Sequence, residues 1–147
     1  MKNPGPGARR RARRAALQSL YQWQATGQTA VEIVEQFGAE ESFAKLDQDY
    51  FKRLVVGVID NVGDLDESLT PFLNRPLAHV DPVERAVLRL AAFELARCPD
   101  VPWRVIINES VELARAFGAE QGHRFVNGVL DKLAPSLRSE THAGPAA

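Results

Sequence analysis

Five arginines stand close together near the start of the chain, and a tyrosine and a tryptophan follow them. Guanidinium groups bind phosphate through charge-assisted hydrogen bonds, and aromatic rings stack on nucleobases. A partner that carries both phosphates and stackable bases fits these residue types. The residues are Arg9, Arg10, Arg11, Arg13, Arg14, Tyr21 and Trp23.

The spacing in this segment predicts a helix from Ala8 to Ala25 with two different sides. At about 100° per residue, the apolar residues gather on one side of the helix. These residues are Ala12, Ala16, Leu20 and Trp23, with Leu17 at the border. Another side carries Arg10, Arg14 and Tyr21, with Gln18 at its edge. The first side can anchor in a core while the second meets a partner.

The charge is unevenly distributed along the chain. Met1 to Val31 contains six Lys or Arg residues and no acid, whereas the remainder holds 12 basic and 19 acidic residues. The formal net charge of −1 therefore hides a basic arm on an acidic body. Such asymmetry favours an anionic partner, and the alternative is a solvated positive tail without function.

Length and composition favour one domain with a real core, since the chain has 147 residues, of which 45% are hydrophobic. The single cysteine, Cys98, excludes an internal disulfide and argues against a cysteine-based metal site. No apolar run reaches the ~20 residues that span a bilayer, and no signal peptide is recognised. We expect a cytoplasmic protein without cofactor or membrane contact, although the Arg-rich start also resembles an organellar transit peptide.

The remaining pattern predicts an all-α chain, because no alternating β pattern is present. Thr29 is expected to cap a short helix from Ala30 to Phe37, and Asp47 to cap a longer one. Gly63 weakens that longer helix, and a restart is expected from Leu65 to Leu73, with a kink at Pro71 inside it. We expect linkers at Glu40 to Leu46 and Asn74 to Val80.

Asp81-Pro82-Val83-Glu84 combines an N-cap, a proline at the first helical position and a glutamate at the third. The helix that follows, to about Ala96, is apolar almost all round and is predicted to be the central buried helix. Two more helices are expected at Trp103 to Phe117 and Glu120 to Leu133, and Pro135 is expected to stop the last one. The predicted organisation is a lead at 1–7, a helical domain at 8–135 and a disordered tail at 136–147.

Residues suited to catalysis or metal binding are not grouped. His79, His123 and His142 lack the spacing of a metal site, and no phosphate loop or nucleophile elbow is present. We expect no enzymatic activity. Glu94 falls on an apolar helix face and is expected to have a structural role. Gly128, in the middle of a predicted helix, indicates either close packing or a surface that faces a ligand.

Five segments in this order resemble the NusB family of bacterial transcription antitermination factors. The resemblance covers roughly Ala8 to Pro135, and the last two of the five segments are specific to the family. The segments are ARRRARRAALQSLYQWQ, YFKRLVVGVIDN, VERAVLRLAAFEL, DVPWRVIINESVELARAFG and HRFVNGVLDKLAP. The resemblance implies an all-helical fold of about seven helices in two packed sub-bundles. It also implies binding of boxA RNA with the ribosomal protein NusE, on elongating RNA polymerase with other Nus factors, in support of rRNA operon transcription.

The resemblance assigns roles to individual residues. The Arg-rich run and Tyr21 correspond to RNA contacts, and the start of the last helix corresponds to a second part of the same surface. The expected RNA-binding residues are Arg9, Arg10, Arg11, Arg13, Arg14, Gln18, Tyr21, Gln121, His123, Arg124 and Phe125. Phe72, Arg75 and Glu84 correspond to the NusE surface.

Two other functions remain open from the sequence. A pure protein-interaction adaptor with an incidental basic arm predicts that RNA plays no part in partner binding. A double-stranded DNA binder is the other alternative, but the chain shows no clear helix-turn-helix.

Overall fold

The computed structural model describes residues 7–139. The described residues are helical throughout their regular structure and contain no strand, which confirms the predicted all-α class. The α-helices are α1 (Ala8–Thr26), α2 (Ala30–Gly38), α3 (Gln48–Asp60), α4 (Val62–Leu69), α5 (Pro82–Arg97), α6 (Trp103–Phe117) and α7 (Gly122–Leu137). Three short 3-10 turns lie at Glu41–Lys45, Thr70–Phe72 and Leu77–His79, within or beside the expected linkers.

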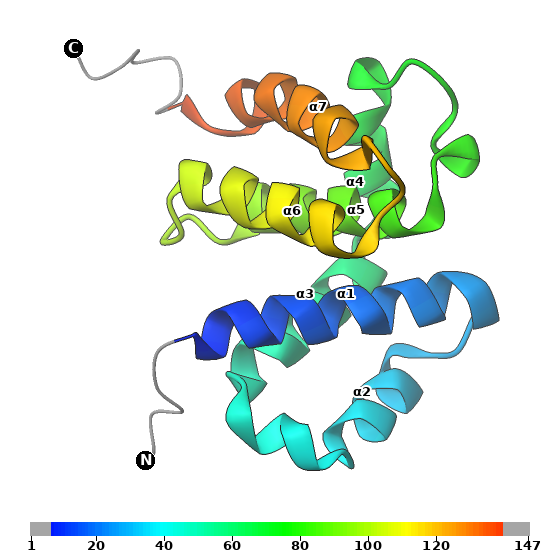
Figure 1. Ribbon diagram of the computed structural model, residues 1–147, viewed down its shortest axis with the longest axis vertical. Coiled ribbons are helices and arrows are strands. Elements are labelled where there is room, and N and C mark those ends of the chain that lie inside the picture. The colour runs from blue at the N-terminus through cyan, green and yellow to red at the C-terminus, as the bar shows by residue number, and fades with distance from the viewer. Residues whose placement is uncertain (1–6, 140–147) are drawn as a thin grey trace. The chain divides into compact units, whose positions relative to one another are not determined.

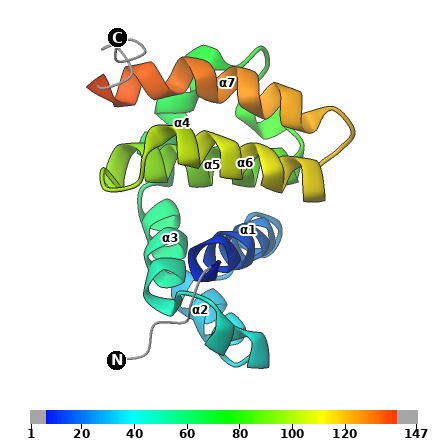
Figure 2. The same cartoon turned by 60° about the vertical axis from the view of Figure 1, so that its left-hand side comes forward.

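The helices form two compact units that divide after Asp60. We call residues 7–60 the N-terminal unit and residues 61–139 the C-terminal unit, and each is described by itself. In the N-terminal unit, α1 packs against α3, and α2 packs against both (Figure 2). In the C-terminal unit, α6 and α7 lie side by side and both pack against α5 (Figure 1).

The apolar side of α1 lies where its spacing predicts. Ala12, Ala16, Leu17 and Leu20 are buried, whereas Trp23 is half-buried. Gly27 ends the helix in a left-handed conformation, φ 72°, that a glycine adopts without strain. The chain then turns into α2, where Thr29 and Glu32 form a capping box. Glu32 accepts hydrogen bonds from Thr29, which lower its pKa.

The centre of the C-terminal unit is α5, as its composition predicts. Asp81 caps the helix by accepting hydrogen bonds from the backbone N–H groups of Val83 and Glu84. Most of its side chains are buried, including that of Glu94, which is 1% exposed. On the partly exposed side, Arg89 forms a bidentate ion pair with Asp66 of α4, with N–O distances of 2.8 and 2.9 Å.

The expected end of the last helix at Pro135 is wrong, because α7 continues to Leu137. The residue after the helix explains why. Arg138 is buried, and its guanidinium donates hydrogen bonds to four carbonyl oxygens at the end of α5 and just beyond it. The acceptors are the carbonyls of Glu94, Leu95, Cys98 and Val101, at 2.7–3.1 Å.

These bonds fix the turn around Pro135 against α5 although proline itself has no N–H to donate. The expectation of a disordered tail from Ser136 is therefore wrong for Ser136 to Arg138. The rest of that tail from residue 140 on, and residues 1–6 of the expected lead, lie outside the described residues.

Candidate nucleic-acid interface

The predicted polar side of α1 is an exposed face of the N-terminal unit. Arg10, Arg14, Gln18 and Tyr21 follow one another at three- or four-residue intervals, and all four are exposed. Tyr21 is 45% exposed, so its ring is accessible to a partner. We call these four residues the α1 face. It places two guanidinium groups and a phenol ring on one stripe of surface.

Arg9 and Arg11 each contact another segment of the N-terminal unit. The guanidinium of Arg9 lies over the ring of Tyr50, 4.1 Å from the ring centroid. Arg11 donates a hydrogen bond from Nε to the carbonyl of Lys45 at 2.7 Å. These contacts tie the first turn of α1 to the start of α3 through Tyr50 and to the segment before α3 through Lys45. Arg9 and Arg11 therefore have a structural role although both are exposed.

Arg13 does not lie on the surface. Its side chain is 5% exposed, and its guanidinium lies 5.6 Å from the centroid of the Tyr50 ring. The assignment of Arg13 as a direct RNA contact is therefore corrected to a core position. Spacing gave a signal for this result, because Arg13 precedes Leu17 by four residues and Leu20 by seven.

The second candidate surface begins at the link between α6 and α7. Gln121 precedes α7 with φ 68°, and it is the one non-glycine residue with positive φ among those described. This left-handed conformation is unfavourable for residues with a Cβ. Strain of this kind persists where surrounding contacts fix the backbone, and here the neighbouring Gly122 is buried.

Glu84 of α5 supplies the fixing contact. Its carboxylate accepts a hydrogen bond from the backbone N–H of Ala119 at 3.3 Å and lies so close to Gly122 that a Cβ there would collide with it. Burial raises the pKa of Glu84, and the nearby Asp81 carboxylate raises it further. Glu84 therefore holds the α6–α7 link in place. Because it is only 3% exposed, its expected role as a direct NusE contact is corrected to a positioning role.

The first turns of α7 carry the remaining predicted residues. Gln121 and Arg124 are exposed, and His123 and Phe125 are half-buried. The guanidinium of Arg75 lies over the Phe125 ring, 4.5 Å from its centroid. The structure thus brings a residue expected at the NusE surface into contact with a residue expected to stack on RNA.

A small groove of about 210 Å³ lies beside this contact, and we call it the aromatic groove. Phe72 and Phe125 line it with Arg124, Lys132 and Gly128. A Cβ added at Gly128 would meet nothing within 4 Å, so close packing does not explain this glycine. Of the two possibilities that the sequence left open, the surface position is the one observed.

Other kinds of site find no support in the described part of the chain. Residues 7–139 contain no group of three or more His, Cys, Asp or Glu that could hold a metal ion. No helix in that range is long and apolar enough to cross a membrane. What the described residues present is a basic and aromatic face on α1, and a second basic and aromatic surface on α7.

Basic and aromatic surfaces on an all-helical fold are suited to binding a nucleic acid. Comparison with known proteins identifies the family. A sequence model described as the NusB family matches residues 10–135. Transcription antitermination protein NusB of Alcanivorax borkumensis is 55% identical over 139 residues, which cover 94% of this chain and 93% of the relative. The protein of the same name from Shewanella halifaxensis is 52% identical over 128 residues, covering 87% and 95%. The chain therefore belongs to the NusB family of transcription antitermination proteins.

Solved structures agree with this assignment. NusB of T. maritima matches with a TM-score of 0.82 and 31% identity, covering 97% of this chain and 99% of that chain. A crystal structure of the antitermination factors NusB and NusE in complex with dsRNA matches with a TM-score of 0.75 and 26% identity, covering 90% and 99%. The predicted family and fold are confirmed, and membership of a family of antitermination factors agrees with the expectation of a non-enzymatic protein.

The two asparagines Asn108 and Asn127 were missed as candidate site residues by the sequence reasoning. Both are exposed and line a polar groove between α6 and α7. A signal existed for Asn108, since it shares one helical stripe with Val111, Glu112 and Arg115.

Proposed function

We propose that this protein binds boxA-containing single-stranded RNA together with NusE, and that it joins elongating RNA polymerase with other Nus factors to support rRNA operon transcription. The observation that carries the proposal is the α1 face, where Arg10, Arg14 and Tyr21 are exposed on one stripe. The arginines supply phosphate contacts, and Tyr21 supplies a ring for a base. A role at RNA polymerase would place the protein in the cytoplasm.

The solved relative with NusE and dsRNA supports a partner of this chemistry. Because that RNA is described as double-stranded, the strandedness of the RNA needs its own test. We favour a single strand, because stacking on Tyr21 or Phe125 requires a base that has left a helical stack.

The first experiment is a titration of labelled RNA. The chain, alone and with NusE, is titrated with boxA RNA, a scrambled strand, and a duplex of the boxA sequence, at two salt concentrations. We expect the highest affinity for single-stranded boxA with NusE, and an affinity that falls steeply with salt. Equal affinity for boxA and scrambled strands in the presence of NusE would contradict sequence-specific binding, and preference for the duplex would contradict the single-strand proposal.

The substitution Tyr21→Ala tests the α1 face directly. Loss of base stacking should weaken boxA binding by about 1–3 kcal/mol. Because Tyr21 is 45% exposed, the thermal midpoint should stay nearly unchanged. A large drop in thermal stability would mean that Tyr21 belongs to the core.

The alternative function, a protein-interaction adaptor, has one observation in its favour. Arg9, Arg11 and Arg13 have contacts inside the N-terminal unit, so part of the basic run is structural. This alternative predicts that the Arg10→Ala/Arg14→Ala variant keeps full assembly with NusE and that added RNA never tightens that assembly. Removal of residues 1–14 would be a poorer test, because the carbonyl of Ala8 accepts a hydrogen bond from Asp47.

A further inference from the structure

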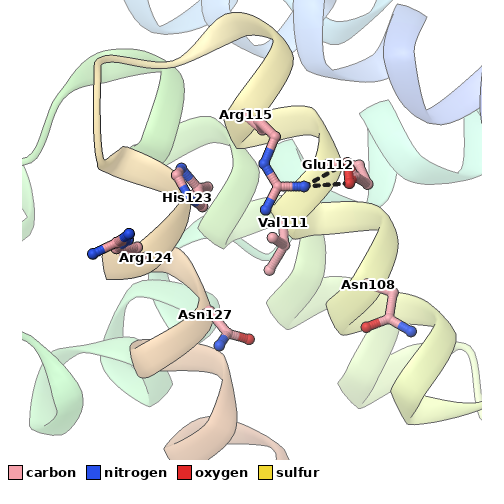
Figure 3. Close-up of a pocket in the computed structure, with 7 residues that line it drawn as sticks. All are labelled: Asn108, Val111, Glu112, Arg115, His123, Arg124 and Asn127. Atoms are coloured by element: carbon pink, nitrogen blue, oxygen red, sulfur yellow. Dashed lines mark hydrogen bonds and ion pairs between the residues drawn. The ribbon is translucent and has the colours of Figure 1, made fainter.

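A polar groove lies between α6 and α7 in the C-terminal unit (Figure 3). Its volume is about 530 Å³, and we call it the α6–α7 groove. Asn108, Glu112 and Arg115 line it from α6, and His123, Arg124 and Asn127 line it from α7. In Figure 3 the carboxamide of Asn127 extends from α7 toward the side of the groove where Asn108 lies. Two amide groups from different helices therefore border the same space.

Most polar groups of this groove are not used by the fold. Glu112 and Arg115 pair with each other at 2.6 and 3.0 Å. Within residues 7–139, the side chains of Asn108, His123, Arg124 and Asn127 make no hydrogen bond or ion pair. A carboxamide presents a donor and an acceptor side by side, which is the pattern that the edge of a nucleobase complements.

The groove adjoins the aromatic groove, because Arg124 lines both. A base held between α6 and α7 would thus have a guanidinium next to it, and beyond that guanidinium the half-buried ring of Phe125. These are the groups that one nucleotide and its neighbour require: polar atoms for a base edge, a cation for the phosphate and a ring for stacking. The contact of Glu84 with the α6–α7 link fixes the start of α7 and hence one wall of the groove.

The lining favours RNA over a protein partner. Protein interfaces are centred on aromatic and aliphatic anchors that fill apolar pockets. Here the groove is lined by polar or charged side chains apart from Val111. A polar groove of this kind matches a base edge better than an apolar side chain.

We propose that the α6–α7 groove is a base-reading subsite that takes one unstacked nucleobase of the RNA, with Asn108 and Asn127 hydrogen-bonded to its edge and Arg124 beside its phosphate. This inference rests on the proposed RNA binding and adds to it. It assigns sequence selection at one RNA position to two residues that have no assigned role.

The experiment compares the full chain with the Asn108→Ala/Asn127→Ala variant in the presence of NusE. Both are titrated with boxA RNA and with a panel in which each position is replaced by the other three bases. For the unmodified protein, we expect a wrong base at one RNA position to lower the affinity by about tenfold. For the variant, we expect this loss of affinity to disappear at that position and at no other. The isosteric Asn108→Asp/Asn127→Asp variant removes the donors and should also lose it. Asn61→Ala removes a carboxamide of the same unit outside the groove and should leave the panel unchanged.

The outcomes separate this inference from the proposed function. If the unmodified chain binds no RNA, the proposed function fails and the subsite with it. If the chain binds boxA but the variant keeps full discrimination at every position, only the subsite is refuted. A variant that loses affinity equally for all RNAs would mean that the groove does not read bases. If the variant binds NusE more weakly than the unmodified chain in the absence of RNA, the groove is a protein surface and the proposal is overturned.

Discussion

The two candidate surfaces are built in different ways. The α1 face consists of side chains at helical spacing on an ordinary stretch of helix, and its residues are exposed. The start of α7 follows a residue in a left-handed conformation, and a buried glycine and a buried glutamate set its position. One surface thus needs only a helix, whereas the other needs contacts between residues far apart in the sequence.

This difference suggests that the two surfaces have different tasks. The α1 face attracts the RNA, and the surface at the start of α7 selects its sequence. Attraction between arginine and phosphate acts over several ångströms and tolerates variable side-chain positions. Reading a base edge requires donors and acceptors held at hydrogen-bond distance. The exposed arginines on α1 suit the first task, and groups beside a fixed helix start suit the second. The predictions below test this division, beginning with the largest expected effect.

The largest effect is expected for Arg10→Ala/Arg14→Ala. Loss of two charge-assisted phosphate contacts should lower RNA affinity at low salt by roughly 100-fold. The slope of log affinity against log salt should fall by about 1.4, since each contact with a single strand contributes about 0.7. Fluorescence anisotropy over a salt series measures both quantities.

The control for this prediction is Arg13→Ala in the same helix. Because Arg13 is buried, its loss should lower the free energy of unfolding and leave the salt slope unchanged. A salt slope reduced by Arg13→Ala, or unchanged in Arg10→Ala/Arg14→Ala, would contradict the assignment of the α1 face.

Gly122→Ala should disrupt the second surface, because it disturbs the contact of Glu84 that holds the α6–α7 link in place. The new Cβ would collide with the carboxylate of Glu84, and overpacking of this kind costs about 1–3 kcal/mol. Gly128→Ala is the matched control in the same helix, where the Cβ meets nothing within 4 Å. That variant should gain up to about 1 kcal/mol from helix propensity. Urea unfolding followed by circular dichroism compares the two, and equal effects would rule out the proposed role of Glu84.

Gln121→Gly should relieve the strain before α7. Glycine adopts φ 68° without the penalty of a Cβ but has more freedom in the unfolded chain, so the expected net gain is roughly 0.5–1 kcal/mol. Gln121→Ala keeps the strain and should gain nothing. If Gln121 also contacts RNA, both variants will bind RNA more weakly. The glycine variant alone will then combine higher stability with weaker RNA binding.

The smallest effect is a pH dependence from Glu84. Its folded pKa lies above the ordinary value of 4.5, so the folded state binds a proton more readily than the unfolded state. As pH rises from 4.5 through the raised pKa, the unmodified protein should lose stability relative to Glu84→Gln. As pH falls through the same window, it should regain that stability.

The helices and their caps could be predicted because local chemistry decides them. Thr29 caps α2 and Asp81 caps the central helix, as the sequence predicts. The exposed stripe of Arg10, Arg14 and Tyr21 follows from helical spacing alone. Family resemblance was needed to connect this stripe with antitermination, since many partners carry phosphate.

Two of the roles assigned from the family resemblance fall on residues that the structure buries. Arg13 and Glu84 both share helical stripes with apolar residues, and both are buried. Their contacts, with Tyr50 and with the α6–α7 link, depend on tertiary packing that spacing does not specify. The same holds for Pro135, where the distant carbonyls bound by Arg138 keep the helix intact beyond the expected stop.

The contacts of Arg138 have a consequence for the order in which the chain folds during synthesis. The carbonyls at the end of α5 receive these hydrogen bonds from a residue some forty positions later in the chain. While the nascent chain emerges from the ribosome, these hydrogen bonds can form only after Arg138 has left the exit tunnel. The contacts described for the N-terminal unit lie within residues 7–60, so they are available much earlier. The basic helix therefore has its scaffold complete before the unit that we propose to read bases is finished.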